Sequence, residues 1–271
     1  MAGLKNSKST GNPVIAIHGW LDNAASFIPL SEQLDTSRPF YALEMPGHGL
    51  SEHRANSTTY HLVENVLDVL AFIAEVVETP DVKVTLIGHS LGGIVCSLVA
   101  AAAPEKIDKL ILLDSLGPMT DPAEAVLDQL RKAIGKISQF KASKKTVYPT
   151  LEMAIAVRMQ GIGKVNAKAA SLLVERGIES VEGGFSWTSD PHLLDPSILR
   201  FSEPQIKSIF GGIECSVCLI CGDQGYFKQY KNLENRIAYI KTVQSHHVNG
   251  GHHFHMDGDV KKTAELIDGF I

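Results

Sequence analysis

The sequence lacks the features that define several classes of protein. Its 25 Lys and Arg residues stand against 30 Asp and Glu, and the net charge of −5 offers no basic field for nucleic acid. No apolar run approaches the ~18 residues of a membrane-spanning helix. The polar stretch from Met1 to Asn12 also lacks the apolar core of a signal peptide, so it predicts a frayed end of a cytoplasmic protein.

Cysteine is scarce as well, and the 4 residues present fit a reducing compartment. Cys215, Cys218 and Cys221 form a C-x-x-C-x-x-C pattern, which could indicate a metal or redox site. However, residues 217–221 are typical of a central strand, on which side chains three apart point to opposite faces. Buried, inert thiols are therefore the favoured interpretation.

What the sequence does contain is the composition of a globular protein. Of its 271 residues, 44% are hydrophobic and 20% are charged. This length allows one large α/β domain with a sizeable core, or a core with a cap.

Strand and helix patterns alternate along most of the chain. Short runs of apolar residues predict strands at 14–17, 40–43, 82–87, 110–113, 217–221 and 241–248. Helical patterns lie between them, at 24–34, 60–78, 91–103 and 260–270. Such alternation predicts a parallel sheet covered by helices on both faces, with catalytic groups at the carboxyl ends of the strands.

One long stretch, residues 117–205, interrupts this alternation. It has helical patterns at 123–136, 150–159 and 167–175, followed by a segment rich in turn residues at 183–196. Because it follows a strand end, we expect a helical lid over a single domain, 1–271, whose core is 13–116 and 206–271. Within the lid, Met153, Met159 and Trp187 could line an acyl pocket, although packing of the lid against the core is an equal alternative.

The most informative motif is Gly88-His89-Ser90-Leu91-Gly92, which lies between a predicted strand and a predicted helix. A Gly-x-Ser-x-Gly in that context is a nucleophile elbow, a turn so tight that its flanking positions must be small. The turn presents the Ser90 hydroxyl near the positive end of the following helix. An ordinary glycine-rich turn is the alternative.

A serine nucleophile needs a base and an oxyanion hole. The loop after the last predicted strand offers His252, His253 and His255 as bases; a metal site or a plain polar loop are the alternatives. The amide of Leu91, directly after the serine, is one candidate oxyanion donor. The second is expected in the loop at Trp20, unless that loop is a plain turn.

These residues are similar to those of a known protein family. The chain resembles the α/β-hydrolase superfamily over nearly its full length, and within it the serine hydrolase-like proteins. The resemblance rests on the stretches 18–27 (HGWLDNAASF), 46–51 (PGHGLS), 88–93 (GHSLGG) and 225–227 (GYF). It implies Ser90 as nucleophile and the amides of Trp20 and Leu91 as the oxyanion hole. The superfamily's histidine precedes a His/Pro-x-Glu/Asp pattern by three residues, and His255-Met256-Asp257 therefore points to His252.

The chain departs from the superfamily pattern in two places. Only 13 residues precede the first predicted strand, where the superfamily has two antiparallel strands, so the sheet could be truncated to six strands. In addition, the usual Gly-x-x-Asp has glycine at its last position, Gly225. The triad acid is then expected at Asp114, a strand-end position that superfamily members also use, with Asp223 as the runner-up. A helix or loop cap is the alternative role for Asp114.

These observations together predict an α/β-hydrolase fold, a mostly parallel sheet flanked by helices with a helical lid insertion. The expected activity is that of a carboxylesterase-like serine hydrolase, which cleaves a small carboxylic ester through an acyl-enzyme. A thioesterase, lactonase, amidase or C–C bond hydrolase with the same triad is the alternative, as is a non-catalytic ligand-binding protein. No cofactor or metal is expected, and the protein would be a monomer or homodimer. Asp22 and Asn23 are expected to cap the next helix.

Overall fold

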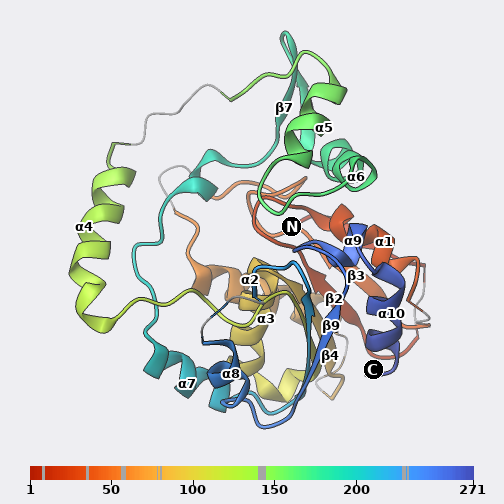
Figure 1. Cartoon of the computed structure of the whole chain (residues 1–271), viewed down its shortest axis with the longest axis vertical. Helices are drawn as coiled ribbons and strands as arrows, with labels where there is room; N and C mark the ends of the chain where they lie inside the picture. The colour runs from red at the N-terminus through yellow and green to blue at the C-terminus, as the bar shows by residue number, and fades with distance from the viewer. Residues whose placement is uncertain are drawn as a thin grey trace.

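A mostly parallel sheet organises the fold (Figure 1). The computed structural model describes residues 1–7, 10–34, 37–55, 59–77, 79, 81–139, 145–227, 230 and 232–271. Its main sheet has seven strands in the order β1-β3-β2-β4-β5-β8-β9. The strands are β1 (Gly3–Lys5), β2 (Val14–Ile17), β3 (Phe40–Leu43), β4 (Val84–His89), β5 (Ile107–Leu113), β8 (Ser216–Gly222) and β9 (Val243–Val248). All neighbours run parallel except β1, so the expected fold class is confirmed.

Helices cover both faces of this sheet because its strands are apolar on both sides. Alternate residues of β5 enter different cores: Leu110 and Leu112 join one, and Ile111 and Leu113 join the other. The first core includes residues of α2 (Leu62–Val76), α3 (Leu91–Ala102) and α7 (Glu203–Gly211), with α8 (Leu233–Ile237) beside α7. The second includes residues of η1 (Ala24–Phe27), α1 (Ile28–Ser31), α9 (Phe254–Asp257) and α10 (Val260–Asp268).

The same alternation explains the cysteines. Cys218 packs in one core and Cys221 in the other, and both thiols are free. Burial raises the pKa of each of these two thiols to about 12, so they stay protonated at neutral pH. The prediction that these thiols are buried is confirmed.

The N-terminal segment corrects one prediction. Residues Gly3–Lys5 are not a frayed end: β1 pairs antiparallel with β3, with Gly3 opposite Leu43, so the sheet is not truncated to six strands. Leu4 packs against the second core, whereas its neighbours Gly3 and Lys5 are exposed. A strand with one inward apolar residue carries almost no hydrophobic pattern, which is why the sequence did not reveal it.

Among the described residues, no helix is long and apolar enough to cross a membrane.

The segment between β5 and α7 lies outside these layers, and its part from residue 151 to residue 187 lies above the carboxyl ends of the strands (Figure 1). It contains η3 (Ala123–Ala125), α4 (Val126–Ile137), α5 (Leu151–Met159), α6 (Ala167–Gly177), the strands β6 (Ile178–Val181) and β7 (Gly184–Trp187), and η4 (Pro191–Leu194). We call this segment the insertion. Its β6–β7 hairpin was not expected from the sequence, where the composition of residues 183–196 indicated turns. Glu182 and Gly183 make the hairpin's turn, with a φ of 87° at Gly183, and Gly184, with a φ of 142°, begins β7 opposite Val181.

Polar contacts hold the insertion against the sheet. The guanidinium of Arg176 on α6 donates to both oxygens of the fully buried Glu44, with Nε 2.6 Å from Oε1. Asn23 donates from its side-chain amide to the carbonyl of Leu173, at 2.9 Å. These contacts place α6 next to the loops that follow β2 and β3.

Candidate active site

Ser90 occupies a strained turn between β4 and α3. Its φ of 51° and ψ of −116° are unusual for a residue other than glycine. The turn is tight because a Cβ at Gly92 would lie 2.0 Å from the carbonyl oxygen of Ile17. The hydroxyl of Ser115 donates to the carbonyl of Ser90 at 2.6 Å and holds this conformation from the next strand. These features have the geometry of a nucleophile elbow.

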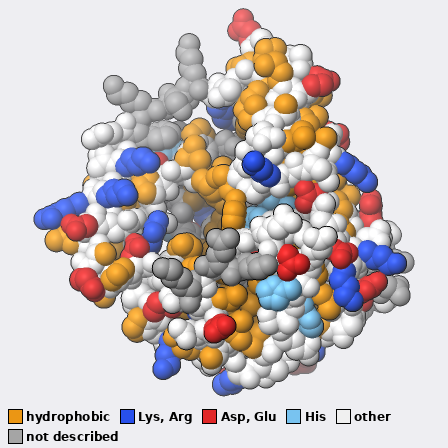
Figure 2. Space-filling view, in the orientation of Figure 1, with side chains coloured by type: hydrophobic (Ala, Val, Ile, Leu, Met, Phe, Trp, Pro, Cys, Tyr) orange, Lys and Arg blue, Asp and Glu red, His pale blue; other side chains and the backbone are white. Residues whose placement is uncertain are grey.

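A small cavity of about 60 Å³ lies above Ser90. Its walls are built from four loops of the sheet and one of the insertion: Gly19, Trp20, Asp22, His89, Ser90, Ile162, Tyr226, His252 and His253. Figure 2 shows apolar side chains gathered around a hollow in the middle of the molecule, with histidine surface at its edge. The structure therefore brings three predicted site residues, Trp20, Ser90 and His252, to one cavity.

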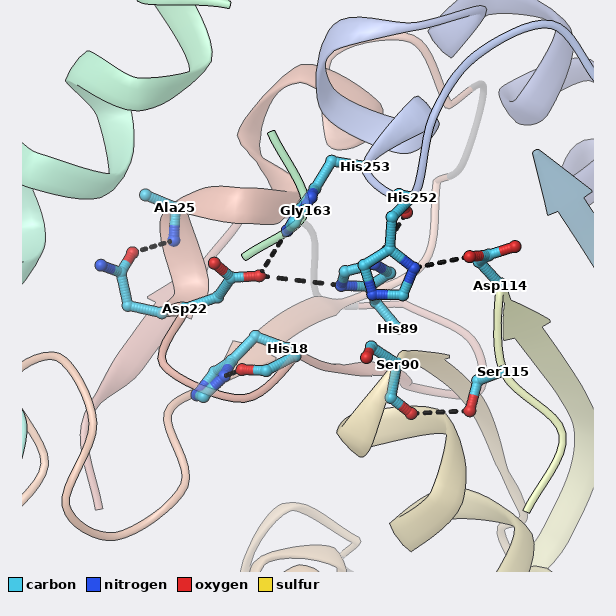
Figure 3. A network of polar contacts seen from close by, with 12 residues as sticks. His18, Asp22, Ala25, His89, Ser90, Asp114, Ser115, Gly163, His252 and His253 are labelled. Atoms are coloured by element: carbon cyan, nitrogen blue, oxygen red, sulfur yellow. Dashed lines mark hydrogen bonds and ion pairs between the residues drawn. The ribbon is translucent and has the colours of Figure 1, made fainter. Parts of the chain in front are cut away.

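His252 is held by Asp114 (Figure 3). Its Nδ1 lies 2.5 Å from Oδ2 of Asp114, and Asp114 is fully buried at the end of β5. Because a carboxylate only accepts hydrogen bonds, Nδ1 carries the proton and Nε2 is the nitrogen left for chemistry. The His252 ring packs between the rings of Tyr226 and His89, with centroid distances of 4.4 and 4.6 Å.

The two candidate acids have different surroundings. Asp223 is exposed, and its amide donates to the carbonyl of Val248. Asp114 lies beside Gly225, where a Cβ would lie 2.2 Å from Asp114 Oδ1, and it accepts the amide of Tyr226 at 2.9 Å. The geometry therefore favours Asp114, which is engaged with His252 rather than acting as a cap.

The two candidate oxyanion donors flank the elbow. Leu91 is the first residue of α3, and Trp20 lies in the cavity wall, with its indole Nε1 bonded to the carbonyl of Leu193 at 2.9 Å. Within the described ranges, no backbone carbonyl accepts from the amide of either residue. Both amides are thus available to a ligand.

A second buried network lies across the cavity from Asp114. Oδ1 of Asp22 accepts from Arg158 of α5 at 2.8 Å, and its Oδ2 accepts from Nε2 of His253 at 2.9 Å. Burial by itself raises the pKa of Asp22, but the electrostatic interaction and hydrogen bond with His253, together with the charge of Arg158, outweigh it and hold that pKa well below its usual range. The expectation that Asp22 caps a helix is wrong, whereas Asn23 does cap, because its Oδ1 accepts from the amide of Ala25 at 3.0 Å.

Two more histidines complete the wall behind His252. His89 and His255 are buried with ring centroids 4.2 Å apart. Burial, and then the charges of neighbouring histidines, lower the pKa of each well below the usual value. Both rings are therefore neutral at neutral pH and cannot replace His252 as the charged partner of Asp114.

Two residues of the cavity wall were not predicted from the sequence, and three residues that were candidates for an acyl pocket do not line the cavity. Ile162 is the insertion's contribution to the cavity wall, whereas Trp187, Met153 and Met159 do not line it. The Tyr226 hydroxyl accepts from the amide of Gly163 at 2.9 Å and so links the sheet to the insertion. Ile162 has no local signal, and Tyr226 lies in a motif of the family resemblance (225–227) that did not indicate its place in the cavity wall.

Comparison with known proteins agrees with this geometry. A family model for the alpha/beta hydrolase fold matches residues 12–142. A serine hydrolase-like protein of Danio rerio is 30% identical over 271 residues, which cover 96% of this chain and 82% of that protein.

The chain belongs to the α/β-hydrolase superfamily and, within it, to the serine hydrolase-like proteins.

A solved structure and a more distant relative extend the comparison. The crystal structure of a hypothetical protein from Pseudomonas aeruginosa PAO1 is 36% identical, with a TM-score of 0.93 and coverage of 99% of this chain and 94% of that chain. A pimeloyl-[acyl-carrier protein] methyl ester esterase of Aliivibrio salmonicida is 26% identical over 216 residues, covering 80% of this chain and 75% of that protein. The family and these relatives make this chain a hydrolase.

Proposed function

We propose that this serine hydrolase-like protein cleaves a small carboxylic ester with Ser90, His252 and Asp114. The observation that carries the proposal is the shared cavity: Ser90 on its strained turn and His252, oriented by a buried carboxylate at 2.5 Å, line the same small space. The insertion acts as a lid over this space and contributes Ile162 to its wall. The name of the Aliivibrio salmonicida relative, a methyl ester esterase, supports an ester substrate.

The first half of the reaction acylates the serine. Oγ of Ser90 attacks the ester carbonyl carbon while Nε2 of His252 takes the hydroxyl proton. The carbonyl oxygen becomes an oxyanion, which the amides of Trp20 and Leu91 stabilise, by about 3 kcal/mol for each donor. Collapse of the tetrahedral intermediate breaks the bond to the alkoxide, and His252 gives its proton to the leaving alcohol.

The second half releases the acid. A water molecule loses its proton to Nε2 of His252 and attacks the acyl carbon. The second tetrahedral intermediate then expels Ser90 Oγ, which regains the proton from His252. Throughout, Asp114 stabilises the imidazolium form of His252 without taking its proton.

A covalent probe tests this proposal directly. A fluorophosphonate labels only an activated serine, and a panel of p-nitrophenyl esters of increasing acyl length measures turnover. Ser90→Ala is expected to abolish both labelling and turnover. The matched control is Ser97→Ala, since Ser97 lies on α3 with its hydroxyl bonded to the carbonyl of Gly93 at 2.8 Å.

The outcomes separate the candidate functions. Turnover near the wild-type rate in Ser90→Ala would contradict the nucleophile assignment. An unlabelled wild-type protein would instead favour a non-catalytic ligand-binding protein. Labelling without turnover of the p-nitrophenyl esters would direct attention to thioesters or lactones.

His252→Ala is expected to be far more damaging to turnover than His253→Ala, because Asp114 holds His252 whereas Asp22 holds His253. A larger loss for His253→Ala would show that the wrong ring has been assigned.

A further inference from the structure

Three side chains that the proposed reaction does not use converge on one wall of the cavity: Asp22, His89 and His253 (Figure 3). Each offers one ligand atom, and these atoms all lie within 4.8 Å of one another. All three residues are buried. This group differs from both metal patterns considered in the sequence, the cysteine repeat and the run of histidines near the C-terminus.

The orientation of His89 points to a missing partner. Its Nε2 lies 3.0 Å from the carbonyl oxygen of His252, which can only accept, so the neutral ring carries its proton on Nε2 and its lone pair on Nδ1. Nδ1 is buried and makes no hydrogen bond within the described part of the chain. It lies 3.8 Å from Oδ2 of Asp22, which is also an acceptor.

Two buried acceptors that face each other are an unfavourable arrangement, and although Oδ2 of Asp22 accepts from His253, the lone pair of His89 Nδ1 recovers none of its lost hydration. A cation or a water molecule between them would satisfy both. Gly19 leaves room for one: a Cβ there would lie 2.9 Å from Nδ1 of His89 and 3.1 Å from Oδ2 of Asp22. The space is part of the cavity wall and is therefore reachable from the cavity.

His253 supplies the third ligand. Its Nε2 lies 2.9 Å from Oδ2 of Asp22, and its Nδ1 makes no hydrogen bond within the described residues. The ring can shift its proton from Nε2 to Nδ1 and present Nε2 as a ligand without losing a proton. Arg158 adds a nearby positive charge: its Nη2 donates to the other oxygen of Asp22 at 2.8 Å and lies 3.4 Å from Nε2 of His253, so it would have to move away from that nitrogen when a metal ion binds.

We infer that Asp22, His89 and His253 bind one divalent transition metal ion of the zinc type beside Ser90. Two imidazoles and one carboxylate are a donor set that Zn²⁺ favours, with a fourth position open to the cavity. Ligand atoms of a tetrahedral zinc site lie about 3.3 Å apart. The separations of 2.9 and 3.8 Å around Asp22 Oδ2 bracket that value, and the two histidine nitrogens lie within 4.8 Å of each other, so the side chains must move toward one another to close the site.

Metal binding at this site would affect ester hydrolysis, an expectation that rests on the proposed function. The ion would lie next to His89, whose ring centroid is 4.6 Å from that of His252. A positive charge there disfavours the imidazolium that His252 must form, and the ion also takes space in a cavity of about 60 Å³. The metal ion is therefore expected to inhibit ester hydrolysis reversibly.

The test is a titration of the chelator-treated full chain with Zn²⁺ by calorimetry, and with Co²⁺ by its visible absorption. One equivalent is expected to bind with a Kd of about 10 µM or tighter, and Co²⁺ should show the intense bands of a tetrahedral site. Asp22→Asn and His253→Ala are each expected to weaken binding by at least about tenfold. His247→Ala, which removes an exposed histidine of β9, is the matched control and should leave binding unchanged.

Two results would overturn the inference. The first is no stoichiometric binding to the wild-type chain, which would mean that a water molecule fills the space. The second is binding that survives both Asp22→Asn and His253→Ala. If Asp22→Asn fails to fold by circular dichroism, His253→Ala decides alone, because it leaves the Asp22–Arg158 ion pair intact. The titration needs no substrate, so a failure of the proposed esterase activity would leave its result readable.

Discussion

In an Asp114→Asn variant, the side chain that orients His252 keeps its shape and loses its charge. Asp114 is fully buried and lies 2.5 Å from Nδ1 of His252, so no water can replace its charge when the imidazolium forms. By analogy with the protease triad, kcat should fall by about 10³–10⁴, which corresponds to about 4–5 kcal/mol in the barrier. The fold should survive, because asparagine tolerates the φ of 45° at this position.

The assay compares kcat on the best p-nitrophenyl ester for Asp114→Asn and for Asp223→Asn, with circular dichroism as the check on folding. Asp223 is exposed, so its replacement should leave kcat within about a factor of two of the wild-type value. Full activity in Asp114→Asn together with a large loss in Asp223→Asn would refute the assignment.

A double variant that moves the carboxylate from position 114 to position 225 extends the same prediction. A Cβ at Gly225 would lie 2.2 Å from Asp114 Oδ1, so an aspartate at 225 fits only if the side chain at 114 is removed. The double variant Asp114→Gly with Gly225→Asp should regain at least about tenfold over Asp114→Gly alone, since a carboxylate returns to the same space. Equal activity of the double and single variants would show that the two positions do not reach His252 equivalently.

Three further predictions concern the insertion and the buried histidines. Arg176→Met should destabilise the protein by about 3 kcal/mol in urea unfolding, because it leaves the buried carboxylate of Glu44 without its cation; an unchanged midpoint would contradict this. Ile162→Ala should shift the preferred acyl length, whereas Trp187→Ala should not, because only Ile162 lines the cavity. Burial, and then the charge of a neighbouring histidine, lower the pKa of His48 from 6.5 to about 3. Between these two pH values His48 is protonated in the unfolded chain and neutral in the folded one. The free energy of unfolding should therefore fall below pH 6.5 by up to about 1.4 kcal/mol per pH unit, and less steeply in His48→Phe; superimposable pH profiles would refute it.

Most of the sheet could be predicted because buried parallel strands are continuous apolar runs. The predicted segment 82–87 corresponds to Val84–His89, and 14–17 and 40–43 match β2 and β3 as they stand. The strand β1 could not be predicted, because its only inward residue is Leu4 and its pairing depends on the free edge of β3. A strand of this kind is specified by its neighbour rather than by its own sequence.

The site was partly predictable for a similar reason. Ser90 and His252 are marked by local patterns, a glycine-flanked turn and a histidine at a fixed offset. Asp22 was misassigned because it stands directly before Asn23, and either residue type can cap a helix. Its actual partner, Arg158, is 136 residues away and has no pattern that separates it from a solvated arginine of a lid helix.

The position of the proposed triad acid shows most clearly what spacing along the sequence cannot decide. β5 and β8 are parallel neighbours, with Leu113 opposite Ile220, so the loops that follow them leave the same edge of the sheet. The β8 loop brings Gly225 back onto Asp114, close enough that a Cβ would meet its carboxylate. The two positions therefore exclude each other, and the glycine at 225 and the aspartate at 114 form one structural feature. In the sequence, Gly225 stands where the usual pattern has an aspartate; in the structure, its lack of a side chain leaves the space that the Asp114 carboxylate occupies.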